Sequence, residues 1–288
     1  MDILKTTADV RRYRKENAQE SIALVPTMGA LHNGHLALMR LAITRADKVM
    51  VSIFVNPTQF GPNEDFDKYP RTHSEDLSKC KATGIDAVFL PDVEVMYPDG
   101  QEHLTQVTPP DILTDQLCGA SRPGHFNGVA TVVLKLLNLV QPDMAVFGEK
   151  DAQQLAILKK MVQDLNVPVD IIAHPTVREP DGLAMSSRNQ YLQNPQERQA
   201  ALALSGILNW IRDQVQLAGG ALPQQEVLPL AAQRLQDLSK NQSQPITLEY
   251  LNAVHQDTLT PVEQLDQNTK VLIAAQVGDV RLIDNLDL

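Results

Sequence analysis

Two histidines three residues apart are the most chemically informative pair in the chain. His32 and His35 stand in the segment His32-Asn33-Gly34-His35, which follows a short apolar run and begins a helix-period stretch. A helix N-terminus presents unpaired N–H groups and the positive end of the helix dipole, so it favours phosphate. Two imidazoles there could stabilise charge on the bridging oxygen of a departing pyrophosphate. The same four positions also fit ordinary turn and capping residues, and both interpretations stay open.

A second polar cluster, Gly148-Glu149-Lys150-Asp151, follows a later apolar run and opens another helix. Lys150 could hold a phosphate as a point charge. Asp151 with Gln154 also fits a capping box, and an acid at a helix start needs no ligand to explain it. We therefore expect Lys150 to contribute more to phosphate binding than Asp151.

A third cluster, Met185-Ser186-Ser187-Arg188, lies between Asp181-Gly182 and Asn194-Pro195, so it is predicted to be a loop. Two hydroxyls can hydrogen-bond phosphate oxygens, and Arg188 can bind them in a fork. A loop in this position would suit a lid over a nucleotide. Taken alone, it also fits an ordinary surface loop.

Two glutamines could bind a substrate with both donor and acceptor groups. Gln59 ends Asn56-Pro57-Thr58-Gln59, directly after an apolar run, and Gln154 lies one turn into its helix. An amide at a strand end could orient a carboxylate or a hydroxyl. Each glutamine by itself is better explained as a surface residue.

Several common signatures are absent from the sequence. There is no G-x-x-x-x-G-K-[ST], no G-x-G-x-x-G after the first strand and no G-x-S-x-G. A Walker loop, a dinucleotide fingerprint and a nucleophile elbow are therefore excluded. His103 and His125 lack partners at metal spacing, and no metal site is predicted in the protein.

These clusters must be positioned by regular elements, and the hydrophobic pattern supplies them. The apolar runs predicted as strands are residues 22–25, 49–55, 86–90, 144–147 and 169–173. Helical patterns separate them, among them residues 128–140 and 152–166. Continuous apolar strands alternating with helices predict an α/β fold with a Rossmann-like, doubly wound parallel sheet. Ligands of such sheets bind beyond the carboxyl ends of the strands, so the clusters are expected at one cleft.

The pattern changes after about residue 176. Residues 195–218 and 223–240 are predicted as two amphipathic helices, and 247–254 and 270–277 as strands. Helices followed by strands predict a smaller C-terminal α+β domain. We expect two domains, 1–176 and 177–288, the second carrying the Met185–Arg188 loop.

Net charge and hydropathy limit the classes of partner that the protein is expected to bind. Of 288 residues, 25 are Lys or Arg and 35 are Asp or Glu, so the net charge is −10. That balance disfavours nucleic acid as a partner. The N-terminus shows no secretory signal, and no apolar run reaches the roughly 18 residues that a membrane span needs. A cytoplasmic protein without membrane contact is expected.

The H-x-G-H pattern after a first strand is similar to the nucleotidyl-transferase superfamily, which includes class I aminoacyl-tRNA synthetases. Longer strings resemble the family of pantothenate synthetases (pantoate–β-alanine ligases, AMP-forming), and they run nearly from end to end. These strings cover residues 26–35, 51–59, 69–72, 121–126, 147–151, 181–189 and 278–285. Residues 195–240 are the least diagnostic part.

The resemblance implies that pantoate is activated as pantoyl-adenylate with release of pyrophosphate, and that β-alanine then displaces AMP. It implies that His32, His35, Lys150 and Arg188 are catalytic, with His35 as the proton donor. The ATP-binding residues it implies are Met28, Gly29, Ala30, Leu31, His32, Asn33, Gly34, His35, Gly148, Glu149, Lys150, Asp151, Val177, Met185, Ser186, Ser187 and Arg188.

For the other substrates, the resemblance implies that Gln59 contacts pantoate and β-alanine, that Gln154 contacts pantoate, and that Asn56 acts at the pantoate end. Mg²⁺ is expected to be held mainly through ATP phosphates, and the family implies a cytoplasmic homodimer.

Three alternatives compete with this resemblance. Another H-x-G-H nucleotidyl transferase of coenzyme biosynthesis is usually shorter and has no need of Gln59 and Gln154. A tRNA-charging enzyme is disfavoured by the net charge. The third alternative is a nucleotide-binding sensor on the same fold, because fold does not fix function, but the presence of both histidines, Lys150 and Arg188 disfavours it.

Overall fold

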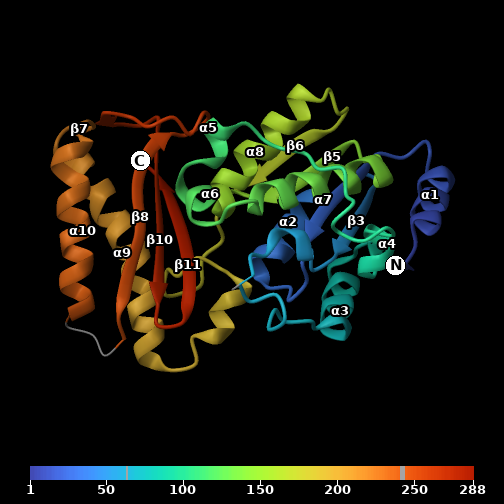
Figure 1. Cartoon of the computed structure of the whole chain (residues 1–288), viewed down its shortest axis with the longest axis horizontal. Helices are drawn as coiled ribbons and strands as arrows, with labels where there is room; N and C mark the ends of the chain where they lie inside the picture. Colours follow the sequence, from blue (N-terminus) through green and yellow to red (C-terminus); the bar gives the residue numbers. More distant parts are fainter. Residues whose placement is uncertain (63, 241–243) are drawn as a thin grey trace. The chain divides into compact units, whose positions relative to one another are not determined.

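The five apolar runs of the first 176 residues and one further short strand pair in a six-stranded parallel sheet (Figure 1). In spatial order its strands are β1 (Asp2–Leu4), β4 (Ala87–Phe89), β3 (Lys48–Ile53), β2 (Ile22–Thr27), β5 (Met144–Gly148) and β6 (Asp170–His174). Every neighbouring pair is parallel. The central strands are buried along almost their whole length, as a sheet covered on both faces requires. The predicted α/β, Rossmann-like fold is confirmed.

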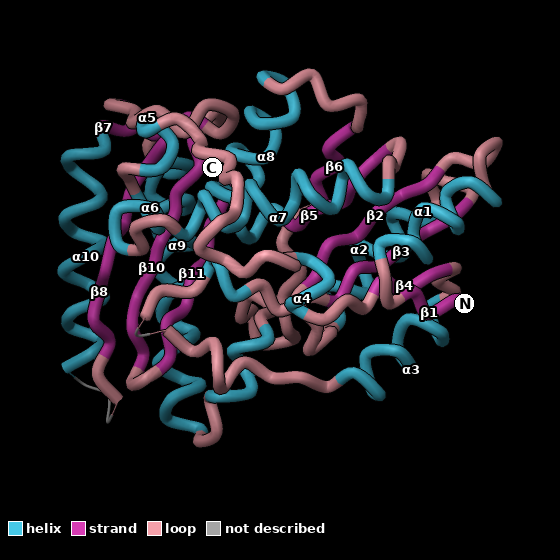
Figure 2. Tube along the Cα trace, turned by 45° about the vertical axis from the view of Figure 1, so that its right-hand side comes forward, coloured by secondary structure: helices cyan, strands magenta, loops and turns pink. Residues whose placement is uncertain are grey.

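The direction of winding reverses between β2 and β5 (Figure 2). The chain runs from β2 to β3 and β4 on one side, and from β5 to β6 on the other. Such a reversal is the point at which open α/β sheets bind ligands. Thr27, the last residue of β2, precedes the segment His32–His35, and Gly148, the last residue of β5, begins the segment Gly148–Asp151.

Helices connect the strands of this sheet. They are α1 (Thr7–Glu16), α2 (Asn33–Ile43), α3 (His73–Thr83), α4 (Val93–Met96), α5 (Asp111–Thr114), α6 (Leu117–Ser121), α7 (His125–Val140) and α8 (Ala152–Asp164). Helices α2 and α3 pack together, and so do α1 and α7. Crossovers between parallel strands are right-handed, so these two pairs cover opposite faces of the sheet.

The C-terminal part contains two long helices and an antiparallel sheet. The helices are α9 (Pro195–Leu217) and α10 (Gln224–Lys240), and the sheet has the order β11 (Val280–Asp287), β10 (Thr269–Val277) and β8 (Ile246–His255). Strands β7 (Leu222–Pro223) and β9 (Gln264–Leu265) form a separate small pair. Helices α9 and α10 and the three-stranded sheet enclose a core of aliphatic side chains.

Strands β1 and β11 were not predicted from the sequence. β1 is only three residues long, and two of them are exposed, so it has no apolar period to detect. β11 contains Asp284 and Asn285, both buried, where a strand pattern calls for apolar residues. Polar residues of these types are depleted in strands, and their pairing with β10 is a tertiary effect.

The structure, a computed structural model, describes residues 1–62, 64–240 and 244–288. By contacts the chain divides into two compact units. The first comprises residues 1–149 and 157–175, and the second comprises residues 150–156 and 176–288. In the described part of the chain, no helix combines the length and the apolar character that crossing a membrane requires.

Candidate active site

The loop between β2 and α2 brings His32 and His35 together as a capping pair. His32 is the N-cap of α2, and its Nδ1 accepts a hydrogen bond from the Gly34 N–H at 3.2 Å. The Nδ1 of His35 accepts one from the His32 N–H at 3.3 Å, and the two ring centroids are 4.0 Å apart. The capping interpretation is therefore correct. It does not compete with catalysis, because a neutral imidazole that accepts at Nδ1 carries its proton on Nε2.

The backbone of this loop is held by Asp76, a residue that carried no functional signal in the sequence. Asp76 lies on α3 and is fully buried. Its carboxylate accepts the N–H of Ala30 at 3.0 Å, the N–H of Leu31 at 2.8 Å and the hydroxyl of Thr72 at 3.2 Å. Three donors satisfy a buried carboxylate that would otherwise be costly.

Two residues of the loop adopt left-handed backbone conformations, Gly29 with φ of 81° and Ala30 with φ of 48°. A β-carbon on Gly29 would lie 3.1 Å from Asp76 Oδ2 and from Ile53 Cγ2, so a side chain fits there poorly. The positive φ of Ala30 is strained for a non-glycine residue. The hydrogen bond from its N–H to Asp76 helps to hold that conformation.

Asn56 and Gln59 follow β3 and form a buried amide cluster. Gln59 is only 9% exposed, so its interpretation as a surface glutamine is wrong. Its Oε1 accepts from Asn56 Nδ2 at 3.1 Å, and its Nε2 donates to Met28 Sδ at 3.0 Å. The last contact joins the strand-end cluster after β3 to the loop after β2.

Asn56 uses both ends of its amide inside the protein. Its Nδ2 also donates to the Gly128 carbonyl at 3.2 Å, and its Oδ1 accepts from the Tyr97 hydroxyl at 2.7 Å and the Thr58 hydroxyl at 2.9 Å. Asn56 is 1% exposed. Its side chain therefore fixes the orientation of Gln59, because each of its polar atoms already has a partner.

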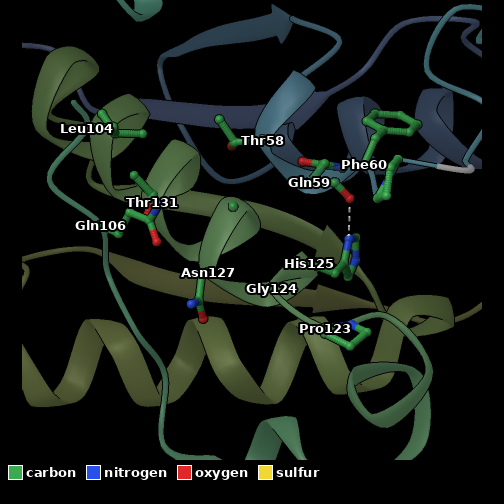
Figure 3. A pocket seen from close by; sticks show the side chains of 13 residues that line it. Thr58, Gln59, Phe60, Leu104, Gln106, Pro123, Gly124, His125, Asn127 and Thr131 are labelled. Atoms are coloured by element: carbon green, nitrogen blue, oxygen red, sulfur yellow. Dashed lines mark hydrogen bonds between the residues drawn. The ribbon is translucent and has the colours of Figure 1, made fainter. Parts of the chain in front are cut away.

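A cavity of about 270 Å³ opens beside Gln59 (Figure 3). Its polar lining residues are Thr58, Gln59, Gln106, His125, Asn127 and Thr131. None of these side chains carries a carboxylate or a permanent positive charge. Neutral donors and acceptors of this kind suit a small ligand with hydroxyl and carbonyl groups.

Arg122 and His125, to which the sequence assigned no role, support this cavity. His125 Nδ1 lies 2.7 Å from the Gln59 carbonyl oxygen (Figure 3). Its Nε2 lies 2.9 Å from Arg122 Nη1. A carbonyl can only accept and a guanidinium can only donate, so Nδ1 carries the proton. Arg122 also binds Glu64 through Nε at 2.6 Å and through Nη2. In the sequence, both residues lie in the string Ser121–Phe126, which was noted only for its resemblance to the family.

The electrostatics of Glu64 follow from that ion pair. Burial opposes ionisation of this carboxylate, but the hydrogen bonds and charge of Arg122 outweigh burial and hold the pKa of Glu64 below its ordinary value. The backbone N–H of Glu64 in turn donates to the Gly61 carbonyl at 3.1 Å. The carboxylate therefore stays ionised at neutral pH and holds Arg122 in place, where its Nη2 donates to the Gln59 carbonyl oxygen at 3.3 Å.

The remaining predicted site residues belong to the second unit, except Gly148 and Glu149. Lys150 and Asp151 lie in the short helix Glu149–Asp151, and Gln154 is half-buried in the first turn of α8. Ser186 caps the short helix Ser187–Tyr191, its hydroxyl accepting from the Arg188 N–H at 3.2 Å. Val177 and Met185 are joined by a backbone hydrogen bond of 2.9 Å. In the part of the chain that the structure describes, no three His, Cys, Asp or Glu side chains gather as a metal site.

A parallel sheet that reverses its winding at β2 and β5, with H-x-G-H capping the helix after β2, defines a doubly wound α/β protein of the kind that binds ligands at the reversal point. The family model Pantoate-beta-alanine ligase matches residues 2–287. This chain belongs to the pantoate–β-alanine ligase family.

Curated relatives agree with the family model. A pantothenate synthetase of Thermoanaerobacter sp. (strain X514) is 50% identical over 289 residues, which cover 99% of this chain and 98% of the relative. A bifunctional pantoate ligase/cytidylate kinase of Thermosynechococcus vestitus is 52% identical over 267 residues, which cover 92% of this chain and 50% of that protein. The chain thus spans about half the length of this bifunctional relative.

Solved structures show the same fold. A pantothenate synthetase from Thermus thermophilus superposes with a TM-score of 0.90 at 42% identity, covering 100% of this chain and 99% of the other. A pantoate-beta-alanine ligase from Francisella tularensis, complexed with Beta-gamma ATP and beta-alanine, has a TM-score of 0.82 at 34% identity. That match covers 100% of this chain and 97% of the other.

Proposed function

We propose that this chain condenses (R)-pantoate with β-alanine, using ATP and releasing pantothenate, AMP and pyrophosphate. Family membership supports the reaction. The structural observation that supports the reaction best is the histidine pair at the start of α2. In this pair, both Nδ1 atoms accept hydrogen bonds from backbone N–H groups. That arrangement presents two Nε2 donors at a helix N-terminus, where a phosphate chain is favoured.

The proposed chemistry has two steps. A carboxylate oxygen of pantoate attacks the α-phosphorus of ATP; a new O–P bond forms, the bridging P–O bond breaks, and pyrophosphate leaves. The amine of β-alanine then attacks the acyl carbon, forming the C–N bond, and the C–O bond to AMP breaks as the amine loses a proton. The mixed anhydride is needed because a free carboxylate is a poor acyl donor. No protein nucleophile takes part.

Four side chains stabilise charge in the first step. His32 and His35 donate from Nε2 to phosphate oxygens, and His35 is the proton donor. Lys150 acts as a point charge on the phosphates. Arg188 binds phosphate oxygens with its guanidinium fork, and Ser186 and Ser187 add hydroxyl donors. The loop Met185–Arg188 closes over ATP in this proposal.

Pantoate and β-alanine bind next to the buried amides. Gln59 contacts both substrates, and Asn56 contributes at the pantoate end by holding the Gln59 amide in place. Gln154 contacts pantoate. The buried contact between Gln59 and Met28 supports this assignment, because it connects the acid-binding residue to the loop of the histidine pair.

Mg²⁺ enters this proposal with ATP, as an ion bound by the phosphate oxygens. No residue of this chain is assigned as its ligand, and the steps above are carried by the protein's own side chains. A homodimer in the cytoplasm is the assembly and location that the family resemblance supports.

Pyrophosphate release measured with and without pantoate tests the proposal. We expect sustained release of pyrophosphate and AMP from ATP only when pantoate and an amine acceptor are both present, because without the amine the reaction stops after one pyrophosphate per site. Formation of ADP would exclude adenylation. Release that does not depend on pantoate would favour another H-x-G-H nucleotidyl transferase instead.

A further inference from the structure

The segment before the Met185–Arg188 loop folds back on itself as a short hairpin. Its ends are joined by the bridge between Arg178 and Ala184, and the Glu179 N–H donates to the Leu183 carbonyl at 2.8 Å. The turn is completed by Gly182, whose φ is 95°. The position of the loop therefore depends on what holds the base of this hairpin.

Arg178 anchors the hairpin to β11. Its guanidinium forms a fork with Asp284, with Nη1 2.7 Å from Oδ2 and Nη2 3.0 Å from Oδ1. Nη1 also donates to the Gly182 carbonyl at 3.1 Å, and Nη2 donates to the Asn285 carbonyl at 3.1 Å. The Asp284 side chain is only 3% exposed. A buried carboxylate with a two-pronged partner fixes geometry far more strictly than a surface ion pair.

The next residue of the same strand holds the other phosphate-binding segment. Asn285 is 4% exposed, and its Nδ2 donates to the Lys150 carbonyl at 2.8 Å. Neighbouring residues of a strand point to opposite faces. Asp284 and Asn285 can therefore fasten two different segments at one place on β11, although Lys150 and Asn285 are 135 residues apart in sequence.

We infer that Asp284 and Asn285 are positioning residues that hold Lys150 and the Ser186–Arg188 loop in a fixed relation to each other. Neither residue touches substrate in this scheme; both act through the backbone that carries the phosphate-binding side chains. The inference rests on the proposed function of Lys150 and Arg188. The additional claim is that β11, through Asp284 and Asn285, determines how tightly ATP is bound.

The test compares Asn285→Ala with Asn252→Ala. Asn252 is exposed on β8 of the same sheet, so its removal controls for a general change in that sheet. Loss of one buried hydrogen bond at Lys150 is expected to raise KM for ATP by about tenfold. KM for β-alanine is expected to stay near the wild-type value, because the Lys150 backbone is assigned to ATP. Asn252→Ala is expected to leave both constants unchanged.

A second readout separates positioning from simple support of the fold. In wild type, a non-hydrolysable ATP analogue should raise the melting temperature, and Asn285→Ala should lose much of that increase. A variant that melts lower but keeps the wild-type KM for ATP and the full increase with the analogue would overturn the inference.

Arg178→Lys gives an independent comparison if Asn285→Ala fails to fold. It keeps a positive charge beside Asp284 but loses the fork and the contacts to the Gly182 and Asn285 carbonyls. We expect KM for ATP to rise again; an unchanged value would also overturn the inference. The wild-type enzyme decides the proposed function separately, because an absence of pantoate-dependent pyrophosphate release there would refute the reaction itself.

Discussion

Replacing His35 separates its two roles, because they use different nitrogen atoms. Nδ1 accepts the His32 N–H at 3.3 Å and so helps to cap α2, whereas Nε2 is the proposed donor to phosphate. Asparagine places an amide oxygen near the position of Nδ1 and keeps the cap. Glutamine places an amide nitrogen near the position of Nε2 and keeps the donor. The two variants therefore test the roles one at a time.

The expected magnitudes follow from these contacts. Loss of one donor to developing negative charge is expected to raise the barrier by about 2.7–4 kcal/mol, roughly 10²–10³-fold in kcat. Loss of a capping acceptor is expected to lower the free energy of unfolding by about 0.5–1 kcal/mol, since the cap from His32 to Gly34 remains. His35→Ala should show both losses. His35→Asn should keep most of the stability but little activity, and His35→Gln should keep more activity than His35→Asn.

Pantoate-dependent pyrophosphate release measures the activity, and urea unfolding measures the stability. Each variant is compared with wild type at saturating ATP, pantoate and β-alanine, so that kcat is not confused with binding. If His35→Asn turned over faster than His35→Gln, the assignment of Nε2 as the donor would be refuted. If His35→Ala retained a near-native rate, His35 would have no part in the chemistry.

Two further changes test the support of the site. Because Arg122 holds the pKa of Glu64 below its ordinary value of 4.5, their pair stabilises the fold above that pH, and this contribution is lost as the pH falls through the folded pKa. Glu64→Gln should therefore lower the free energy of unfolding by about 1 kcal/mol near neutral pH, with a smaller difference in acid; urea unfolding that showed the same loss at both pH values would contradict an ionic origin. Gly128→Ala would place a β-carbon 2.2 Å from the Thr58 carbonyl oxygen, so we expect a loss of about 1–3 kcal/mol together with reduced kcat. In the matched change Gly206→Ala, the new β-carbon meets nothing within 4 Å, and a gain of about 0.5–1 kcal/mol is expected; equal melting temperatures for the two variants would contradict the packing argument.

Much of the fold was predictable because its signals are local. Strands β2, β3 and β5 each contain a short apolar run, and a strand buried on both faces needs such a run. The capping of α2 by His32 is likewise contained within four residues. The three polar segments after strand ends could also be predicted to share one edge of the sheet, because parallel strands present their carboxyl ends together.

Local patterns could not predict contacts between distant segments. Asp76 resembles an ordinary acid in the first turn of a helix, and only the packing of α3 beside α2 brings it to the Ala30 N–H, 46 residues away. The burial of Gln59 depends on the approach of α7 to the end of β3, which a glycine at position 128 permits.

The sequence by itself determined the α/β class, the cap of α2 and the residue types able to handle phosphate, since each follows from spacing within a few residues. Only the tertiary structure decided which backbone groups hold those residues in place. Asn285 contacts the Lys150 carbonyl because β11 pairs with β10, and no periodicity of either segment encodes that meeting. A hydrogen bond depends on distance and direction in space, and the strand pairing that sets them is a property of the whole folded chain.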